Sequence, residues 1–158
     1  EHEIWLSLQP FLDDEDATPF PEGSVNRIKQ IQMFQGTEQA YELAIEHGLK
    51  LAWGTDTLFD AQLATRQGAQ LVKMVRWFEP AEVLKMATST NAELLALSGP
   101  RSPYPGTLGV VQEGALADLL LVNGDPIADI ELVADPESNF LMIMKDGEIF
   151  KNITAITP

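Results

Sequence analysis

The residues best suited to chemistry lie in segment 51–57, which reads LAWGTDT. Its short apolar run predicts a buried strand over 50–53, and the turn after it carries the carboxylate Asp56. In a parallel α/β structure, a carboxylate at the carboxyl end of a strand faces the loops that build the active site. There it could act as a general base and then as a general acid. Taken alone, however, an Asp after Gly54 and Thr55 is more typical of a turn or a helix N-cap.

Histidine and cysteine are scarce. The chain has no Cys, which excludes disulfides, thiolate zinc sites and cysteine nucleophiles. His47 precedes Gly48 at the end of a predicted helix, where a cation favours the negative end of the helix dipole, so we interpret it as a capping residue. His2 stands where a strand is expected to begin, and active-site residues of parallel α/β structures lie at the opposite, carboxyl end of the strands.

Three other side chains stand near the predicted strand ends. Gln9 closes the first predicted strand and is a weak candidate for a substrate contact, against a plain hydrogen-bonding role. Trp53 and Phe59 flank Asp56, and burial is the simpler role for both, with the wall of a substrate site as the alternative. The serines have no His and Asp partners arranged as a triad, so serine hydrolysis has little support.

Acidic residues dominate the charge, with 24 Asp plus Glu against 10 Lys plus Arg and a net charge of −14. Nucleic acid and anionic membranes are therefore not expected as partners. The acidic run 13–16 lacks the Gly and the terminal Glu of an EF-hand loop, which favours a solvated loop over a calcium site. A glycosidase that pairs Asp56 with an acid of that run would rest only on the abundance of carboxylates.

Composition and length fit one globular domain or two small pieces of larger ones, because 45% of the 158 residues are hydrophobic and 22% charged. No apolar run reaches the roughly 18 residues of a membrane-spanning helix, and the first residues lack the basic and apolar regions of a signal peptide. The chain begins Glu1-His2 rather than with Met, which suggests a beginning inside a longer protein.

The elements that must position these residues follow an α/β order. Thr37 is expected to cap the second helix and Asp60 the third, in which Leu63, Gln67, Leu71, Met74, Val75 and Phe78 share one side. The predicted order is a strand over 4–9, helices over 26–34 and 38–47, a strand over 50–53, and helices over 60–78, 81–88 and 91–97.

The pattern changes in the Pro- and Gly-rich stretch 99–109, which we interpret as a boundary between regions 1–98 and 99–158. Beyond it, strands are predicted over 108–111, 119–122 and 140–144, with Asp118 as a structural turn residue. The Asp146-Gly147 pair predicts a tight hairpin, because its turn needs positive φ angles. This order fits the end of a (β/α) barrel followed by a small all-β unit.

Four segments identify a family by their order and spacing, although any one of them alone would be a weak signal. They are 52–57 (AWGTDT), 77–84 (WFEPAEVL) through 87–88 and 91–92, 106–109 (GTLG) and 113–119 (EGALADL). In this order they resemble the C-terminal part of the amidohydrolase superfamily, in particular its imidazolonepropionase-like and Xaa-Pro dipeptidase-like branch. The resemblance extends over nearly the whole chain from Leu49 onward.

The resemblance implies an α/β fold: the C-terminal part of a (β/α)8 TIM-type barrel over 1–98, then strands of a small β-sandwich over 99–158. It implies a divalent metal, usually zinc, held in the full-length parent, with Asp56 as metal ligand and proton shuttle. The family's His-x-His pair, its bridging Lys or Glu and its two further His ligands have no counterpart here, so this chain alone is not expected to retain the metal.

Two functions remain open at this point. The first is a fragment of a metal-dependent hydrolase that cleaves carbon-nitrogen bonds in a small amide or peptide-like substrate. The second is a catalytically inactive unit that associates with copies of itself, because two barrel strands leave open sheet edges and uncovered apolar faces. We expect a homo-oligomer in either case.

Overall fold

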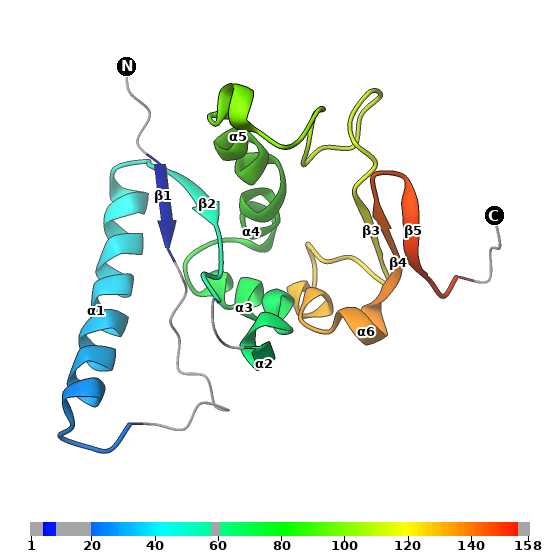
Figure 1. Cartoon of the computed structure of the whole chain (residues 1–158). Coiled ribbons are helices and arrows are strands. Elements are labelled where there is room, and N and C mark those ends of the chain that lie inside the picture. The colour runs from blue at the N-terminus through cyan, green and yellow to red at the C-terminus, as the bar shows by residue number, and fades with distance from the viewer. Residues whose placement is uncertain (1–4, 9–19, 58–60, 155–158) are drawn as a thin grey trace.

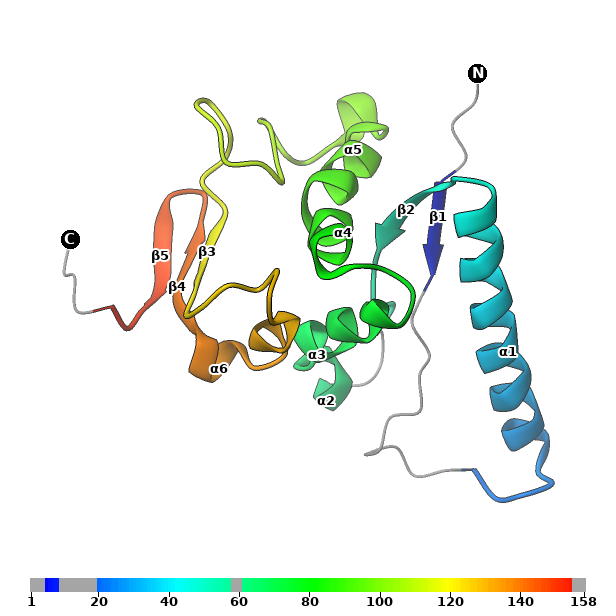
Figure 2. The same cartoon turned by 180° about the vertical axis from the view of Figure 1, so that it is seen from behind.

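The computed structural model describes residues 5–8, 20–57 and 61–154 of the chain, as mixed helices and sheet (Figure 1). Strand β1 (Trp5–Leu8) pairs in parallel with β2 (Lys50–Trp53), with Trp5 opposite Lys50 and Leu8 opposite Trp53. The connection between them contains α1 (Val25–Glu46), which lies beside the two strands in Figures 1 and 2. A parallel pair joined by a crossover helix is the unit predicted from the sequence.

Helix α1 is a single helix, so the prediction of two helices with an N-cap at Thr37 is wrong. Ser24 caps its beginning, since Ser24 Oγ accepts a hydrogen bond from the backbone N–H of Arg27 at 3.2 Å. Thr37 lies inside the helix and donates its hydroxyl to the carbonyl of Met33. The neighbouring Gly36 lowers helix propensity by about 1 kcal/mol, which weakens a helix without ending it.

The helical segments after β2 also differ from the prediction. Instead of one helix over 60–78, the chain forms α2 (Ala61–Ala64), α3 (Gln67–Val72) and a 3-10 turn, η1 (Lys73–Arg76). The expected pair of short helices is one continuous run, in which the π-helical turn η2 (Met86–Thr90) joins α4 (Pro80–Lys85) to α5 (Asn91–Ala96). Helical periodicity is shared by α, 3-10 and π turns over such short distances, so the pattern could not separate them.

The C-terminal region forms a second, antiparallel sheet in the order β3-β4-β5. Asp146 and Gly147 have φ of 50° and 80°, which confirms the predicted hairpin. Residues 108–111 are not a strand, because only an isolated bridge joins Thr107 to Ala115 there. The elements are η3 (Gly99–Arg101), β3 (Leu119–Val122), η4 (Ile130–Val133), α6 (Pro136–Asn139), β4 (Phe140–Lys145) and β5 (Glu148–Asn152).

One buried cluster connects the helices to the second sheet. Its most deeply buried side chains are Tyr41, Met74 and Val83, and it continues to Ile130 and Phe140 on the other side of the predicted boundary. The Tyr41 ring lies 4.3 Å from the Trp77 ring between centroids. The two regions therefore share packing, and their separation into domains stays a prediction.

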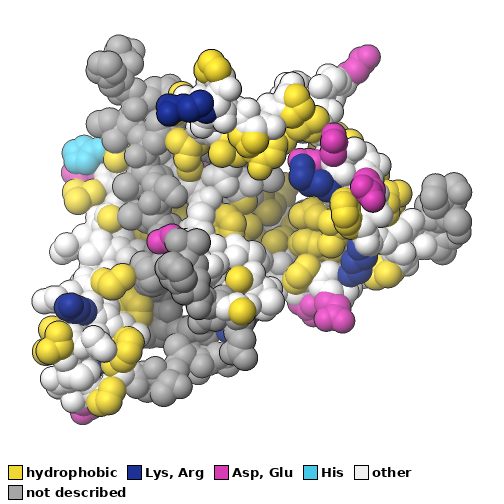
Figure 3. Space-filling view, viewed as in Figure 1, with side chains coloured by type: hydrophobic (Ala, Val, Ile, Leu, Met, Phe, Trp, Pro, Cys, Tyr) yellow, Lys and Arg dark blue, Asp and Glu magenta, His cyan; other side chains and the backbone are white. Residues whose placement is uncertain are grey.

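Large apolar side chains also remain at the surface (Figure 3). On α1 they include Val25, Ile28 and Leu43, each at least half exposed, and on the second sheet Leu120 and Phe150. Within the described residues, no helix is long and apolar enough to cross a bilayer.

Candidate active site

Asp56 follows the carboxyl end of β2, three residues after Trp53. Its backbone has a φ of 49°, in the left-handed region that few residues other than Gly, Asn and Asp adopt. The carboxylate is exposed. The turn therefore presents an acid to solvent at the end of a parallel strand, the position that the sequence analysis gave it.

The threonines on both sides of Asp56 are joined by the side chain of Gln67, the first residue of α3. Thr55 Oγ1 donates to Gln67 Oε1 at 2.8 Å, and Gln67 Nε2 donates to Thr57 Oγ1 at 2.9 Å. The two hydroxyl oxygens are 3.1 Å apart. Thr55 is buried, with 8% of its surface exposed, so its hydroxyl needs such partners.

The last residue of β2 is held from α5. Asn91 Oδ1 accepts the backbone N–H of Trp53 at 2.9 Å, and Asn91 Nδ2 donates to the carbonyl of Trp53 at 2.9 Å. Trp53 itself is half-buried against the core, as expected, and its indole N–H is buried without an acceptor among the described residues. Phe59, its predicted companion, lies outside the described residues.

Helix α1 is fixed to the segment before α4 by polar and aromatic contacts. Glu38 accepts the indole N–H of Trp77 at 2.9 Å and forms an ion pair with Arg76. The Tyr41 hydroxyl faces Met74 Sδ at 3.4 Å, and burial raises the pKa of Tyr41 well above its usual range. Tyr41 is therefore a neutral core residue near neutral pH rather than a proton donor for chemistry.

The remaining predicted residues contribute nothing to this cluster. His47 is the exposed C-cap residue of α1, which confirms its predicted position, while the role of its side chain stays a prediction. Asp118 Oδ1 accepts the N–H of Asp146 at 2.7 Å at the β4-β5 turn, which confirms it as a structural residue. His2, Gln9 and the acidic run 13–16 lie outside the described residues.

The residues that sequence reasoning missed are Gln67 and Asn91. The sequence does contain an indication for Gln67, because it is the one polar residue on the otherwise apolar side of a predicted helix. A polar group on such a side needs a hydrogen-bond partner. Asn91 lay in a quoted family-like segment, but no local pattern indicated a contact with a strand almost forty residues earlier.

The described residues do not form a complete metal site. No three His, Cys, Asp or Glu side chains within this part of the chain come together in a group that could hold a metal ion. A catalytic zinc site uses about three protein ligands and keeps one position open for water. Asp56 is therefore not part of a complete metal site within the described residues.

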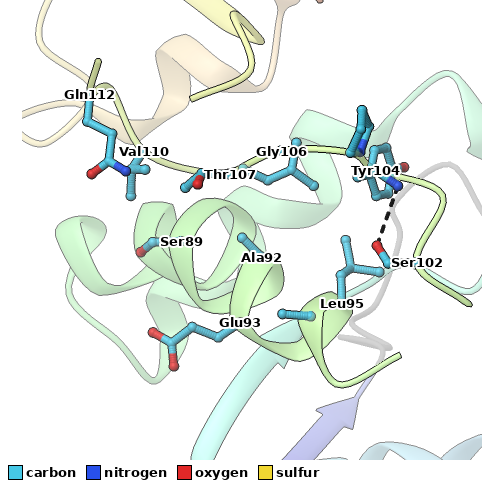
Figure 4. Close-up of a pocket in the computed structure, with 13 residues that line it drawn as sticks. Ser89, Ala92, Glu93, Leu95, Ser102, Tyr104, Gly106, Thr107, Val110 and Gln112 are labelled. Atoms are coloured by element: carbon cyan, nitrogen blue, oxygen red, sulfur yellow. Dashed lines mark hydrogen bonds between the residues drawn. The ribbon is translucent and has the colours of Figure 1, made fainter. Parts of the chain in front are cut away.

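A separate groove of about 630 Å³ lies between α5 and the loop 102–112 (Figure 4). Ala92 and Leu95 face it from the helix, and Tyr104, Thr107 and Val110 line it from the loop. Asp56 is not among the residues that line it. The groove combines apolar walls with scattered hydroxyls and holds no arrangement of acid, base and nucleophile.

Comparison with known proteins identifies relatives of the chain. An ochratoxinase from Aspergillus niger is 32% identical over 119 residues, which cover 72% of this chain and 22% of the relative. A protein named putative aminohydrolase from Methanothermobacter thermautotrophicus is 35% identical over 115 residues, 67% of this chain and 27% of the relative. The chain thus spans about a quarter of the length of these relatives.

Solved structures give the same result for the fold. An amidohydrolase crystal structure aligns over 94% of this chain and 34% of its own, with a TM-score of 0.72 and 24% identity, which speaks for the fold alone. A prolidase complexed with N-methylphosphonate-L-proline aligns over 80% of this chain and 29% of its own, with a TM-score of 0.67 and 26% identity. The Aspergillus niger ochratoxinase structure aligns over 84% of this chain and 29% of its own, with a TM-score of 0.66 and 27% identity.

A family model described as "Amidohydrolase family" matches residues 21–150, which include β2, the Asp56 turn and most of the second sheet. The resemblance first seen in separate sequence segments therefore extends through one continuous match. The chain belongs to the amidohydrolase family.

Proposed function

We propose that the protein containing this chain is a metal-dependent hydrolase of carbon-nitrogen bonds, and that Asp56 is one of its catalytic carboxylates. The observation that carries the proposal is the exposed Asp56 side chain in a left-handed turn at the carboxyl end of a parallel strand, within the family match. Carboxylates at this end of a strand serve active sites in α/β barrels.

The proposal includes a place for the chain in a larger fold. Residues 1–98 would be the last part of a (β/α)8 barrel, and residues 99–158 would contribute strands to a β-sandwich. The parallel β1-β2 pair with its crossover helix supports the first assignment, and the antiparallel β3-β4-β5 sheet supports the second.

Asp56 has two roles in this proposal. Its carboxylate accepts a proton from the attacking water and donates it to the leaving nitrogen, which avoids expelling an unprotonated amide anion. A divalent metal, which we propose to be zinc, would supply a water of lowered pKa when bound. Asp56 would contribute one oxygen ligand, with the others outside the described residues, so the 158 residues alone are not expected to retain the metal.

The substrate class is a small amide or a peptide-like molecule. Two relatives support it by their names, an ochratoxinase and a prolidase with a bound L-proline derivative. Gln9 remains a weak candidate for a substrate contact. Nucleic acid and membranes remain unexpected partners, given the net charge of −14.

The test uses the complete in-frame gene product that contains this chain. It is assayed for hydrolysis of Xaa-Pro dipeptides and N-acyl amino acids, with divalent metal and after chelation. We expect Asp56→Asn to lower kcat by about 100- to 10,000-fold and chelation to abolish turnover. Wild-type turnover by Asp56→Asn, or by the chelated protein, would contradict the proposal.

A second candidate function is association of the chain with copies of itself as a structural unit. It is favoured by the exposed apolar side chains of α1 and by Leu120, Leu121 and Phe150 on the second sheet. Light scattering on the 158-residue chain should give a mass above that of one copy. A monomer at all concentrations would exclude this candidate without affecting the first.

A further inference from the structure

The side chain of Gln67 reaches both neighbours of Asp56 from a different helical segment. Residues 55 and 57 bracket Asp56 in the chain, and the Gln67 amide contacts the hydroxyls of both at 2.8 and 2.9 Å. Gln67 is the first residue of α3, a helix that packs against η4 and contributes Leu71 and Val72 to the buried cluster. Two anchor points on either side of one residue restrict the backbone rotation between them.

The directions of these hydrogen bonds can be assigned. Gln67 Oε1 can only accept, so Thr55 donates its single hydroxyl proton to it. In the 3.1 Å contact between the hydroxyls, Thr57 must then donate to Thr55. Gln67 Nε2 completes the ring by donating to Thr57, and it also approaches the carbonyl of Ala64 at 3.3 Å. The amide nitrogen thus has an acceptor for each proton, which fixes the orientation of the amide.

The ring is closed and runs in one direction, from Gln67 to Thr57, to Thr55 and back to Gln67. Each hydroxyl in it accepts one hydrogen bond and donates one, an arrangement in which neighbouring bonds strengthen one another. It joins the two residues on either side of Asp56, whose φ of 49° is a left-handed conformation that side chains other than Gly, Asn and Asp rarely adopt, and it holds the turn in that conformation.

We propose that Gln67 is a positioning residue for Asp56, acting through Thr55 and Thr57. This inference rests on the proposed catalytic role of Asp56. Gln67 does not contact the reacting atoms. It holds the turn in the one conformation that directs the carboxylate to its working position, and displacement of such a group by about 1 Å can lower the rate by about 100-fold.

The central variant is Gln67→Leu, which keeps the size of the side chain and removes both hydrogen-bonding groups. Gln67 is exposed, so the fold should tolerate the change. In the complete gene product we expect kcat to fall by about 10- to 100-fold with a smaller change in KM. Gln39→Leu, at an exposed position of α1, is the matched control and should leave kcat unchanged.

The ring predicts a specific pattern among further variants. Thr57→Val removes one hydroxyl and should lose about as much activity as Gln67→Leu, whereas Thr57→Ser should lose less. Because the members of the ring act as a unit, the kcat of the double variant Gln67→Leu/Thr57→Val should be little lower than that of either single variant. Independent losses that multiply in the double variant would overturn the ring as the mechanism.

A measurement without turnover separates this inference from the proposed function. Hydrogen exchange over residues 55–57 should accelerate in Gln67→Leu by more than its loss of global stability accounts for, and it should not accelerate in Gln39→Leu. Unchanged exchange and unchanged kcat would overturn the positioning role. If Asp56→Asn keeps wild-type activity, the proposed function fails instead, whatever Gln67→Leu does.

Discussion

The side-chain amide of Asn91 binds the backbone of Trp53 as a neighbouring strand would. It accepts the Trp53 N–H and donates to the Trp53 carbonyl, both at 2.9 Å. The strand β2 pairs with β1 on one edge, and Asn91 satisfies its last residue on the other. A single side chain from α5 thus fixes the end of the strand that leads into the Asp56 turn.

Replacement of Asn91 by Ala should therefore destabilise the protein. Two hydrogen bonds to half-buried backbone groups are lost, and we expect the free energy of unfolding to fall by about 1–3 kcal/mol. Urea denaturation of the complete gene product measures it. The control is Asn26→Ala, at an exposed position of α1, which should change stability by no more than about 0.5 kcal/mol. An equal loss of unfolding free energy at both positions would show that the contact between Asn91 and Trp53 does not stabilise the protein.

The left-handed backbone at Asp56 makes its own prediction about which substitutions fold. Asn and Gly adopt a φ of 49° readily, whereas a β-branched residue does not. Asp56→Asn and Asp56→Gly should keep the wild-type unfolding midpoint, and Asp56→Val should lose about 1–2 kcal/mol. Thermal unfolding of the three variants decides the matter, and a Val variant as stable as the Gly variant would show that the turn relaxes freely.

The position of Asp56 could be predicted because its signals are local. A short apolar strand followed by Gly-Thr-Asp defines both the strand and its end within seven residues, and the Asp146-Gly147 hairpin is defined in the same way. Asp118 was expected to be structural for the same reason, although its partner Lys145 was not foreseen.

The contacts that hold Asp56 in place could not be predicted in this way. Gln67 reaches Thr55 only because the helical segment breaks near Arg66, and a periodic pattern does not show such a break. Asn91 lies directly after the π turn η2 and contacts Trp53 on a strand 38 residues earlier. Both depend on tertiary packing, which overrides local preference when the segments are short.

The ion pair at the β4-β5 hairpin should make stability depend on acid pH. A side-chain hydrogen bond from Lys145 and a backbone hydrogen bond from Asp146 hold the pKa of Asp118 below its usual value of 3.8. Because the pKa is lower in the folded state, the stabilisation is present above 3.8 and is lost as pH falls through the folded-state pKa. The stability difference between wild type and Asp118→Asn should therefore shrink below that pH.

The measurement is the urea midpoint of both proteins as a function of pH, with Glu113→Gln as a control for removal of one exposed negative charge. The contribution of Lys145 to stability changes with pH in the opposite direction, at alkaline pH. Its pKa is raised by Asp118 above 10.5, so its contribution is present below 10.5 and disappears as pH rises through the folded-state value. A wild-type advantage that persists unchanged at the acid end would contradict the pairing.

Substitution of two helical glycines tests whether the stability of region 1–98 depends on its contact with η4 of region 99–158. A Cβ added at Gly68 in α3 would lie 2.0 Å from the carbonyl oxygen of Val133, whereas one added at Gly36 in α1 would meet nothing within 4 Å. Gly68→Ala must therefore push α3 away from η4, and we expect a loss of about 1–3 kcal/mol. Gly36→Ala should instead gain about 0.5–1 kcal/mol, because alanine favours the helix and restricts the unfolded chain.

The free energy of unfolding of both variants is measured by urea denaturation. A loss at Gly68 together with a gain at Gly36 would establish that the loss comes from the contact with η4. If both variants are stabilised, α3 and η4 can separate without loss, and regions 1–98 and 99–158 are energetically independent.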